Sequence, residues 1–241
     1  MANPHRKSTP VSTVSKRVKQ ASSKPTPERL GAEDWILAAQ EELITHGVLG
    51  VKVDRLARRL RVTRGGFYWH FRSHSHLLEV LLKRWVVTNT TPFIRVLELE
   101  GGAQKKFQAV VNLWVSETEY NPRLDSAVRE WARVSPRVSR LMQREDDARV
   151  AVLQTIFREL GYEATDALVR ARIAYFHQVG YYAMGIIEPI AKRRRLMPHY
   201  TRALLGEGLR ATNELRGFAT PQKAANEAIR VQAAQSAKFR S

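Results

Sequence analysis

The stretch from Thr63 to His70 carries residue types suited to binding a polyanion. Arg64 ends in a planar guanidinium that can bind guanine O6 and N7 together, or alternatively a single phosphate. Gly65 and Gly66 follow directly, and each glycine costs a helix about 1 kcal/mol relative to alanine. Two in a row indicate that another molecule must approach closely, unless they mark a frayed helix start. The predicted chemistry is contact with nucleic acid.

The aromatic residues beside Arg64 divide into two groups. Phe67 and Phe71 lie four positions apart, so they share one helix face and are predicted to be buried. Trp69 falls on another face, where it either contacts a thymine methyl or sugar, or covers a small core. Thr63 precedes the helix, so its hydroxyl is expected to cap a backbone N–H while the helix N-terminus faces a phosphate.

Two short helices are needed to present these side chains. The first starts at Asp54, a good N-cap, and runs to Leu60 with its apolar residues on one face and its arginines on the other. The second runs from Arg64 to His70. The three residues between them make the pair a predicted helix-turn-helix. A longer helix ending at His46-Gly47 precedes the pair.

These motifs resemble the DNA-binding domain of the TetR family of bacterial transcriptional repressors over about residues 31–85. The resemblance rests on Val53-Asp54-Arg55-Leu56-Ala57, Leu60, Val62 to Phe71, and Leu77-Leu78. It implies phosphate contacts from Lys52, Tyr68 and His70. Two positions depart from the family pattern. Arg61 stands where a turn glycine is common, at a cost if its φ is positive, and His74 stands where a lysine usually contacts phosphate.

The complete set of expected DNA contacts is Lys52, Thr63, Arg64, Gly65, Gly66, Tyr68, Trp69, His70 and His74.

The rest of the chain has helical periodicity and no convincing strand pattern, which predicts an all-α protein. Further helices are expected at 73–88, 107–119, 124–131, 136–161, 165–187 and 199–215. The expected organisation is a flexible basic arm (1–28), a three-helix helix-turn-helix domain (29–89, motif about 52–71), a larger helical ligand-binding and dimerisation domain (90–216), and an Ala/Gln-rich tail (217–241). The arm either reaches DNA or is a solvated tail.

The resemblance implies a small-molecule pocket in the larger domain, although aromatic stripes in helices are usually core. The candidate pocket residues are Trp114, Arg129, Trp131, Phe176, His177 and Tyr181, with Arg129 and His177 as polar anchors. Small residues between Ala171 and Gly185 would let a partner helix approach closely, which predicts a homodimer. The basic run Lys192–Arg195 is expected to be a solvated loop.

Composition and charge narrow the function. The formal net charge is +17, distributed as +8 over residues 1–72, +1 over 73–191 and +8 over 192–241. The absence of cysteine excludes disulfides and thiolate metal sites and agrees with a cytoplasmic protein. His70, His74 and His76 lack an accompanying carboxylate, so no metal and no cofactor is expected. No catalytic or phosphate-binding motif is found, which argues against an enzyme. No apolar run is long enough to span a membrane.

The expected function is a sequence-specific DNA-binding transcriptional regulator. By resemblance it is a homodimeric repressor that a small-molecule effector releases from a double-stranded DNA operator, although activation stays open. The alternatives are a non-specific architectural DNA-binding protein, which would bind with a steep salt dependence and little sequence preference, and an enzyme of the helical domain.

Overall fold

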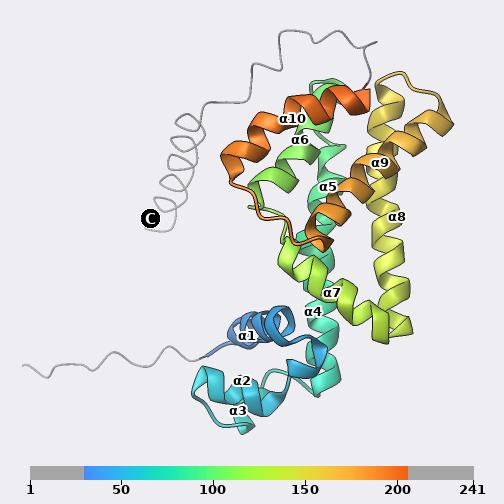
Figure 1. Ribbon diagram of the computed structural model, residues 1–241. Helices are drawn as coiled ribbons and strands as arrows, with labels where there is room; N and C mark the ends of the chain where they lie inside the picture. Colours follow the sequence, from blue (N-terminus) through green and yellow to red (C-terminus); the bar gives the residue numbers. More distant parts are fainter. Residues whose placement is uncertain (1–29, 206–241) are drawn as a thin grey trace, which may run out of the picture. The chain divides into compact units, whose positions relative to one another are not determined.

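The computed structural model describes residues 30–205, which fold into helices joined by short connections (Figure 1). No strand occurs within these residues, and the predicted all-α class is confirmed. The expected arm (1–28) and tail (217–241) lie outside the described residues. The elements are α1 (Ala32–His46), the 3-10 turn η1 (Val48–Gly50), α2 (Val53–Leu60), α3 (Gly65–Tyr68), α4 (His74–Asn89), α5 (Thr91–Val96), α6 (Gly102–Ser116), α7 (Pro122–Val134), α8 (Pro136–Glu159), α9 (Ala164–Ala183) and α10 (Ile190–Leu205).

Capping side chains fix where two of the helices begin. The Ser73 hydroxyl accepts a hydrogen bond from the His76 N–H at 3.1 Å and starts α4. The Asn121 side chain accepts from the Leu124 N–H at 3.0 Å and starts α7. The helices α7 and α8 also have proline in the first turn, where its missing N–H costs no helical bond.

Three expectations about helix boundaries were wrong. The cap of α2 is Lys52, which has an extended backbone, and Asp54 lies in the first turn, where its charge still favours the helix N-terminus. The run Lys192–Arg195 is helical and not a loop. The last described helix begins at Ile190, nine residues before the expected start at His199.

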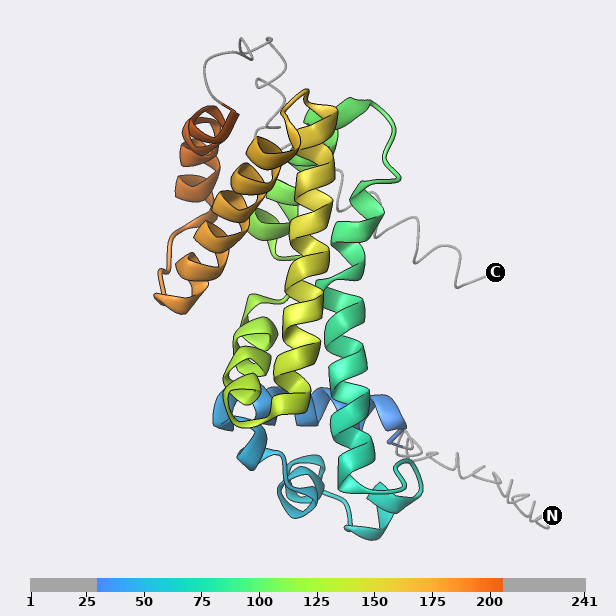
Figure 2. The ribbon, with the colours of Figure 1, turned by 90° about the vertical axis from the view of Figure 1, so that its right-hand side faces the viewer.

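The first hydrophobic core joins the N-terminal helices to α7 and α8. Trp35, Phe67 and Trp85 are fully buried in it, and they pack with residues from α7 such as Val128. In Figure 2, α1 lies across the lower half of α4 and the lower ends of α7 and α8. Residues before and after position 90 therefore share the first core, so the expected domain boundary at residue 90 does not separate two hydrophobic cores.

The second core lies farther along the long helices. It is built from α5, α6, α8 and α9 around buried Phe93, Leu153 and Phe157. The helix α8 packs against α9, as both views show (Figures 1 and 2). The helix α10 contacts α6 and α9.

Candidate nucleic-acid interface and ligand cavity

Buried aromatic rings hold α3 in place. Phe67 is fully buried, stacks on Phe71 at 5.2 Å between ring centroids, and meets Trp35 edge-on at 5.5 Å. The prediction that Phe67 and Phe71 share a buried face is confirmed. Because these rings fix one side of a single-turn helix, the orientation of its other side is fixed as well.

The opposite side of α3 is open to solvent. Trp69 is 88% exposed and Tyr68 is 53% exposed. Most of the other expected DNA contacts are also exposed, and Gly66 is half-buried. The exposed residues of that set are Lys52, Thr63, Arg64, Gly65, Tyr68, Trp69 and His70. A tryptophan with almost no protein contact does not cover the core, so the second of the two roles considered for Trp69 is excluded.

The turn before α3 has a left-handed residue at Arg61. Its backbone angles are φ 57° and ψ 39°, and the adjacent Val62 N–H donates to the Ala57 carbonyl at 3.0 Å. A side chain in this conformation costs about 1 kcal/mol that glycine would not. The conformational cost expected from having Arg61 where a turn glycine is common is therefore present.

Glu42 divides the arginines of α2 into two groups. It is buried and accepts hydrogen bonds from Arg55 and Arg59, each at 3.2 Å. Burial alone would raise the pKa of Glu42, but these two bonds hold it below its ordinary value. Arg55 and Arg59 therefore join α2 to α1, whereas Arg58 stays exposed with Arg61 on the outer side.

Two expected DNA contacts have different local roles. The Thr63 hydroxyl does not cap α3; its backbone carbonyl accepts from the Gly66 N–H at 3.1 Å, because Arg64 already has a helical backbone. The His74 ring is half-buried and its Nε2 lies 2.6 Å from the Val51 carbonyl oxygen, to which it donates. His74 is thus tied to the segment before α2 and not free to reach a phosphate through Nε2.

The glycines of α3 have space around them. A Cβ built on Gly65 would lie 3.7 Å from the Thr63 hydroxyl, and one on Gly66 would lie 3.8 Å from the Trp35 ring. Both are ordinary contact distances, and neither glycine has a positive φ. The fold itself therefore does not require glycine at either position.

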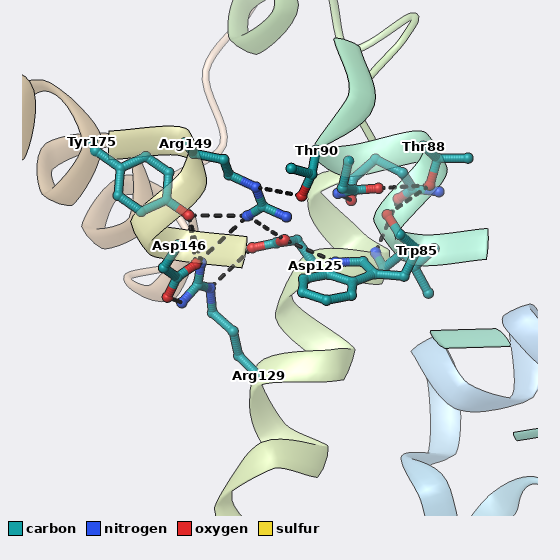
Figure 3. A network of polar contacts seen from close by, with 11 residues as sticks. Trp85, Thr88, Thr90, Asp125, Arg129, Asp146, Arg149 and Tyr175 are labelled. Atoms are coloured by element: carbon teal, nitrogen blue, oxygen red, sulfur yellow. Dashed lines mark hydrogen bonds and ion pairs between the residues drawn. The ribbon is translucent and has the colours of Figure 1, made fainter. Parts of the chain in front are cut away.

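A network of charged side chains lies inside the helical bundle (Figure 3). Asp125 of α7 is 3% exposed and Arg149 of α8 is fully buried. Asp125 Oδ1 accepts from Arg149 Nη1 and from Trp85 Nε1, each at 3.0 Å, and its Oδ2 accepts from Arg129 Nε at 2.9 Å. The carboxylate thus connects α4, α7 and α8.

Tyr175 joins α9 to the same network. Its hydroxyl donates to Asp146 at 2.7 Å and accepts from Arg149 Nη1 at 2.9 Å and from Arg129 Nη2 at 3.0 Å. Arg129 binds Asp146 through two bonds of 2.8 and 2.7 Å. One polar atom is left over, since Arg149 Nη2 is buried without a hydrogen-bond partner among the described residues.

The charges in this network balance. Burial alone would raise the pKa of Asp125, but the charges of Arg149 and Arg129 hold it below its ordinary value. Burial also raises the pKa of the Tyr175 hydroxyl. The Asp125 carboxylate is therefore ionised beside two guanidinium groups, with the tyrosine neutral, in a largely water-excluded position.

A cavity of about 220 Å³ lies between α6, α9 and α10. Of the expected pocket residues, Trp114, His177 and Tyr181 line it. Apolar side chains form most of the remaining wall, among them Phe107, Val111, Ile173 and Met197.

The other three expected pocket residues lie elsewhere. Arg129 belongs to the charged network, where two aspartates bind it. Trp131 is 8% exposed and packs in the first core. Phe176 is 58% exposed because it points away from the bundle. Aromatic type and helical position did not reveal which helices would enclose the cavity.

One member of the basic run forms part of the cavity wall. Arg193 is 9% exposed and donates to Glu117 Oε1 at 2.5 Å and to the Trp114 carbonyl at 2.6 Å. Its guanidinium also lies 5.0 Å from the centre of the Tyr181 ring. Arg193 therefore fastens α10 to the end of α6.

The exposed side of α9 carries large apolar side chains beside the exposed Arg172. Of the small residues expected to face a partner, Ala171 and Ala174 are instead buried within the second core, whereas Ala183 and Gly185 are exposed. The outer face carries Val169, Ile173 and Phe176, which are 49%, 54% and 58% exposed. Their spacing places them along one side of the helix.

Comparisons with known proteins match the N-terminal part of the chain by sequence and a longer span by fold. Residues 36–81 match the model of the family described as bacterial regulatory proteins, tetR family. An uncharacterized HTH-type transcriptional regulator, TtgW, of Pseudomonas putida is 37% identical over 62 residues, which are 26% of this chain and 42% of that protein. The chain therefore matches less than half the length of this curated relative.

Solved structures resemble the chain over a longer span. A transcriptional regulator of the TetR/AcrR family from Thermobifida fusca aligns with a TM-score of 0.53 and 18% identity, covering 74% of this chain and 98% of that one. The fatty acid degradation regulator FadR from Bacillus halodurans aligns with a TM-score of 0.56 and 15% identity, covering 78% and 99%. At these identities the likeness concerns the fold.

The matched family model and the helix-turn-helix together show that residues 36–81 are similar to the DNA-binding region of bacterial regulatory proteins of the tetR family. Over the longer span, the all-helical fold resembles that of TetR/AcrR regulators.

Two further findings concern the described residues alone. None of their helices has the length and apolar character that crossing a bilayer requires. Between residues 30 and 205, no three or more His, Asp or Glu side chains are grouped so that they could hold a metal ion.

Proposed function

We propose that the protein is a sequence-specific DNA-binding transcriptional regulator, with α3 as its recognition helix. The observation that carries the proposal is the exposed face of α3, where Arg64 and the 88% exposed Trp69 stand on a helix fixed from behind by Phe67. Exposed Arg58 and Arg61 add positive charge on the outer side of the helix-turn-helix. This face supplies groups for phosphates and for base edges.

The substitution Arg64→Ala tests the role of α3. Arg64 is exposed and its ion pair with Asp54, at 3.5 Å, joins two exposed side chains, so the fold should not depend on it. If Arg64 binds a guanine, the variant loses discrimination among operator variants, by a factor of about 5 to 150 at one base pair. If it binds phosphate, affinity falls equally for all sequences.

The matched control is Arg158→Ala, a half-exposed arginine in the last turn of α8, whose C-terminal end lies far from α3 in Figure 1. This variant should bind DNA like the wild type. A wild-type protein that prefers no genomic site over bulk DNA at physiological salt would contradict the proposal and favour the architectural alternative, for which the net charge of +17 is the supporting observation.

The apolar outer face of α9 supports a homodimer. Two large apolar side chains seven positions apart, Val169 and Phe176, are costly to leave in water and suited to a two-fold contact. Phe176→Glu should convert the dimer to a monomer in light scattering. Val134→Glu, at an apolar residue of α7 that is 74% exposed, should leave the mass unchanged.

The cavity supports regulation by a small molecule that releases a repressor from DNA. Ala174 and Gln178 of α9 line the cavity, and Tyr175 between them enters the charged network that reaches Trp85 of α4. Occupation of the cavity can therefore bias α4, which follows the recognition helix.

This coupling is tested without an effector by hydrogen exchange. Tyr175→Phe should speed exchange of the α4 backbone amides near Trp85, because the network loses three hydrogen bonds. Tyr162→Phe removes a hydroxyl that bonds the Leu205 carbonyl outside the network and serves as the control. Equal exchange in α4 for both variants would argue against the route.

A further inference from the structure

An unsatisfied amide lies in the wall of the cavity between α6, α9 and α10. Gln178 is 7% exposed, lines the cavity, and its Nε2 has no hydrogen-bond partner among the described residues. A buried donor left without a partner costs about 1–3 kcal/mol. This cost is recovered when the amide turns toward the cavity and a molecule there supplies an acceptor.

The cavity is long and mostly apolar. Its α9 wall extends from Arg170 to Tyr181, a span of about 16 Å at the helical rise per residue. Phe107, Val111 and Ile173 are among the apolar residues along it. Its volume of about 220 Å³ lies between a cavity that holds benzene, about 150 Å³, and pockets for drug-sized ligands, from about 300 Å³. A narrow chain fits this space better than a fused ring system.

The charges of Arg193 and Glu188 in the cavity wall are already paired. Arg193 lies 2.5 Å from Glu117, and Lys192 lies 2.5 Å from Glu188. An ion added at this end would lack a counterion and would lose its hydration, which is unfavourable. The group that meets Gln178 should therefore be uncharged.

The opposite end has one further cation. Arg170 lies with its guanidinium 4.2 Å from the centre of the Tyr162 ring and donates to the Leu204 carbonyl. Arg170 and Gln178 are eight residues apart on α9, about 12 Å along the helix axis. A single small head group cannot bind both, so an anion at this end would meet Arg170 and leave Gln178 unsatisfied, which makes octanoate the competing probe.

We propose that the cavity binds an uncharged, elongated carbonyl compound, whose apolar chain lies along α9 and whose carbonyl oxygen accepts a hydrogen bond from Gln178. This inference rests on the proposed function, because it names the class of effector for that regulator. The binding itself is measured in the absence of DNA, so it stands or fails separately from operator recognition.

The probes are 2-octanone, 2-butanone and octanoate, titrated calorimetrically into the full-length protein. 2-Octanone should bind saturably. 2-Butanone, with four fewer methylene groups to bury, should bind on the order of a hundredfold more weakly. Octanoate should bind more weakly than 2-octanone because its carboxylate lacks a counterion near Gln178. Tighter binding of octanoate, or no saturable binding of 2-octanone, would overturn the proposal.

The variant Gln178→Leu separates the hydrogen bond from the apolar wall. It should bind 2-octanone about tenfold more weakly, because one hydrogen bond is lost, and its melting temperature without ligand should rise, because the unpaired amide is gone. Gln143→Leu, at an exposed glutamine of α8, is the matched control and should change neither quantity. Unchanged affinity of Gln178→Leu, or a lower melting temperature, would show that the amide has a structural partner and would overturn the assignment.

Discussion

Replacing Asp125 by asparagine should remove a large part of the stability of the fold. The carboxylate is 3% exposed and accepts hydrogen bonds from Trp85, Arg129 and Arg149 at 2.9–3.0 Å. Asp125→Asn keeps the shape of the side chain but leaves two buried guanidinium groups with only Asp146 as a counterion. Removing one partner of a buried ion pair lowers the free energy of unfolding by about 3–5 kcal/mol. A typical domain has only about 5–15 kcal/mol of stability in total.

Urea unfolding followed by circular dichroism measures this loss. Protein concentration must be held constant, because the stability of the proposed dimer would depend on it. The control is Arg137→Ala, which breaks an ion pair of 3.0 Å to Glu79 that also connects α8 to α4. Both of its side chains are largely exposed, at 71% and 43%, so its loss should stay below about 1 kcal/mol. A loss for Asp125→Asn no greater than that of the control would refute the view that the buried network holds the bundle together.

Three further outcomes are expected. Arg61→Gly should raise the free energy of unfolding by about 1 kcal/mol, because φ is 57° there, and thermal melting checks this; a lower melting temperature would contradict it. Gly65→Ala should stabilise α3 by up to about 1 kcal/mol. The same variant should weaken DNA binding in a gel shift, because the added Cβ would fill space on the face proposed to meet DNA. Unchanged DNA affinity would mean that DNA does not approach Gly65 closely. The folded-state pKa of Asp125 lies below its ordinary value, so its contribution is fully present above the ordinary aspartate pKa and is lost as the pH falls through the folded value. Acid titration should therefore destabilise the wild type below about pH 4, and Asp125→Asn should lack this part of the loss.

Local signals in the sequence were sufficient to predict the helix-turn-helix and the buried face of its second helix. Four-residue spacing predicted that Phe67 and Phe71 are buried together, and a missing glycine indicated strain at Arg61. Both depend on neighbours within a few residues, which is the range over which helical periodicity is informative.

The internal sites depend on residues far apart in the chain. Arg129 meets Asp146 and Tyr175, which are 17 and 46 positions away, and Arg193 meets Glu117 from 76 positions away. Only the local part of the network, with Asp125 and Arg129 four apart, was visible as a possible ion pair on one helix face. A run of four basic residues gives no indication that its second member is buried, because that depends on how α10 packs.

The hydrogen bond between Trp85 and Asp125 gives α4 the mechanical character of a lever. Trp85 is held near one end of the helix, and His74 at the other end is bonded to the carbonyl of Val51, just before α2. Eleven residues separate the two points, about 17 Å, so a tilt of about 6° around Trp85 displaces the His74 end by about 1.7 Å. A shift of that size exceeds what hydrogen bonds to base edges tolerate. Under the proposed function, a small rearrangement around the Trp85 indole would therefore be magnified into a loss of register at the DNA.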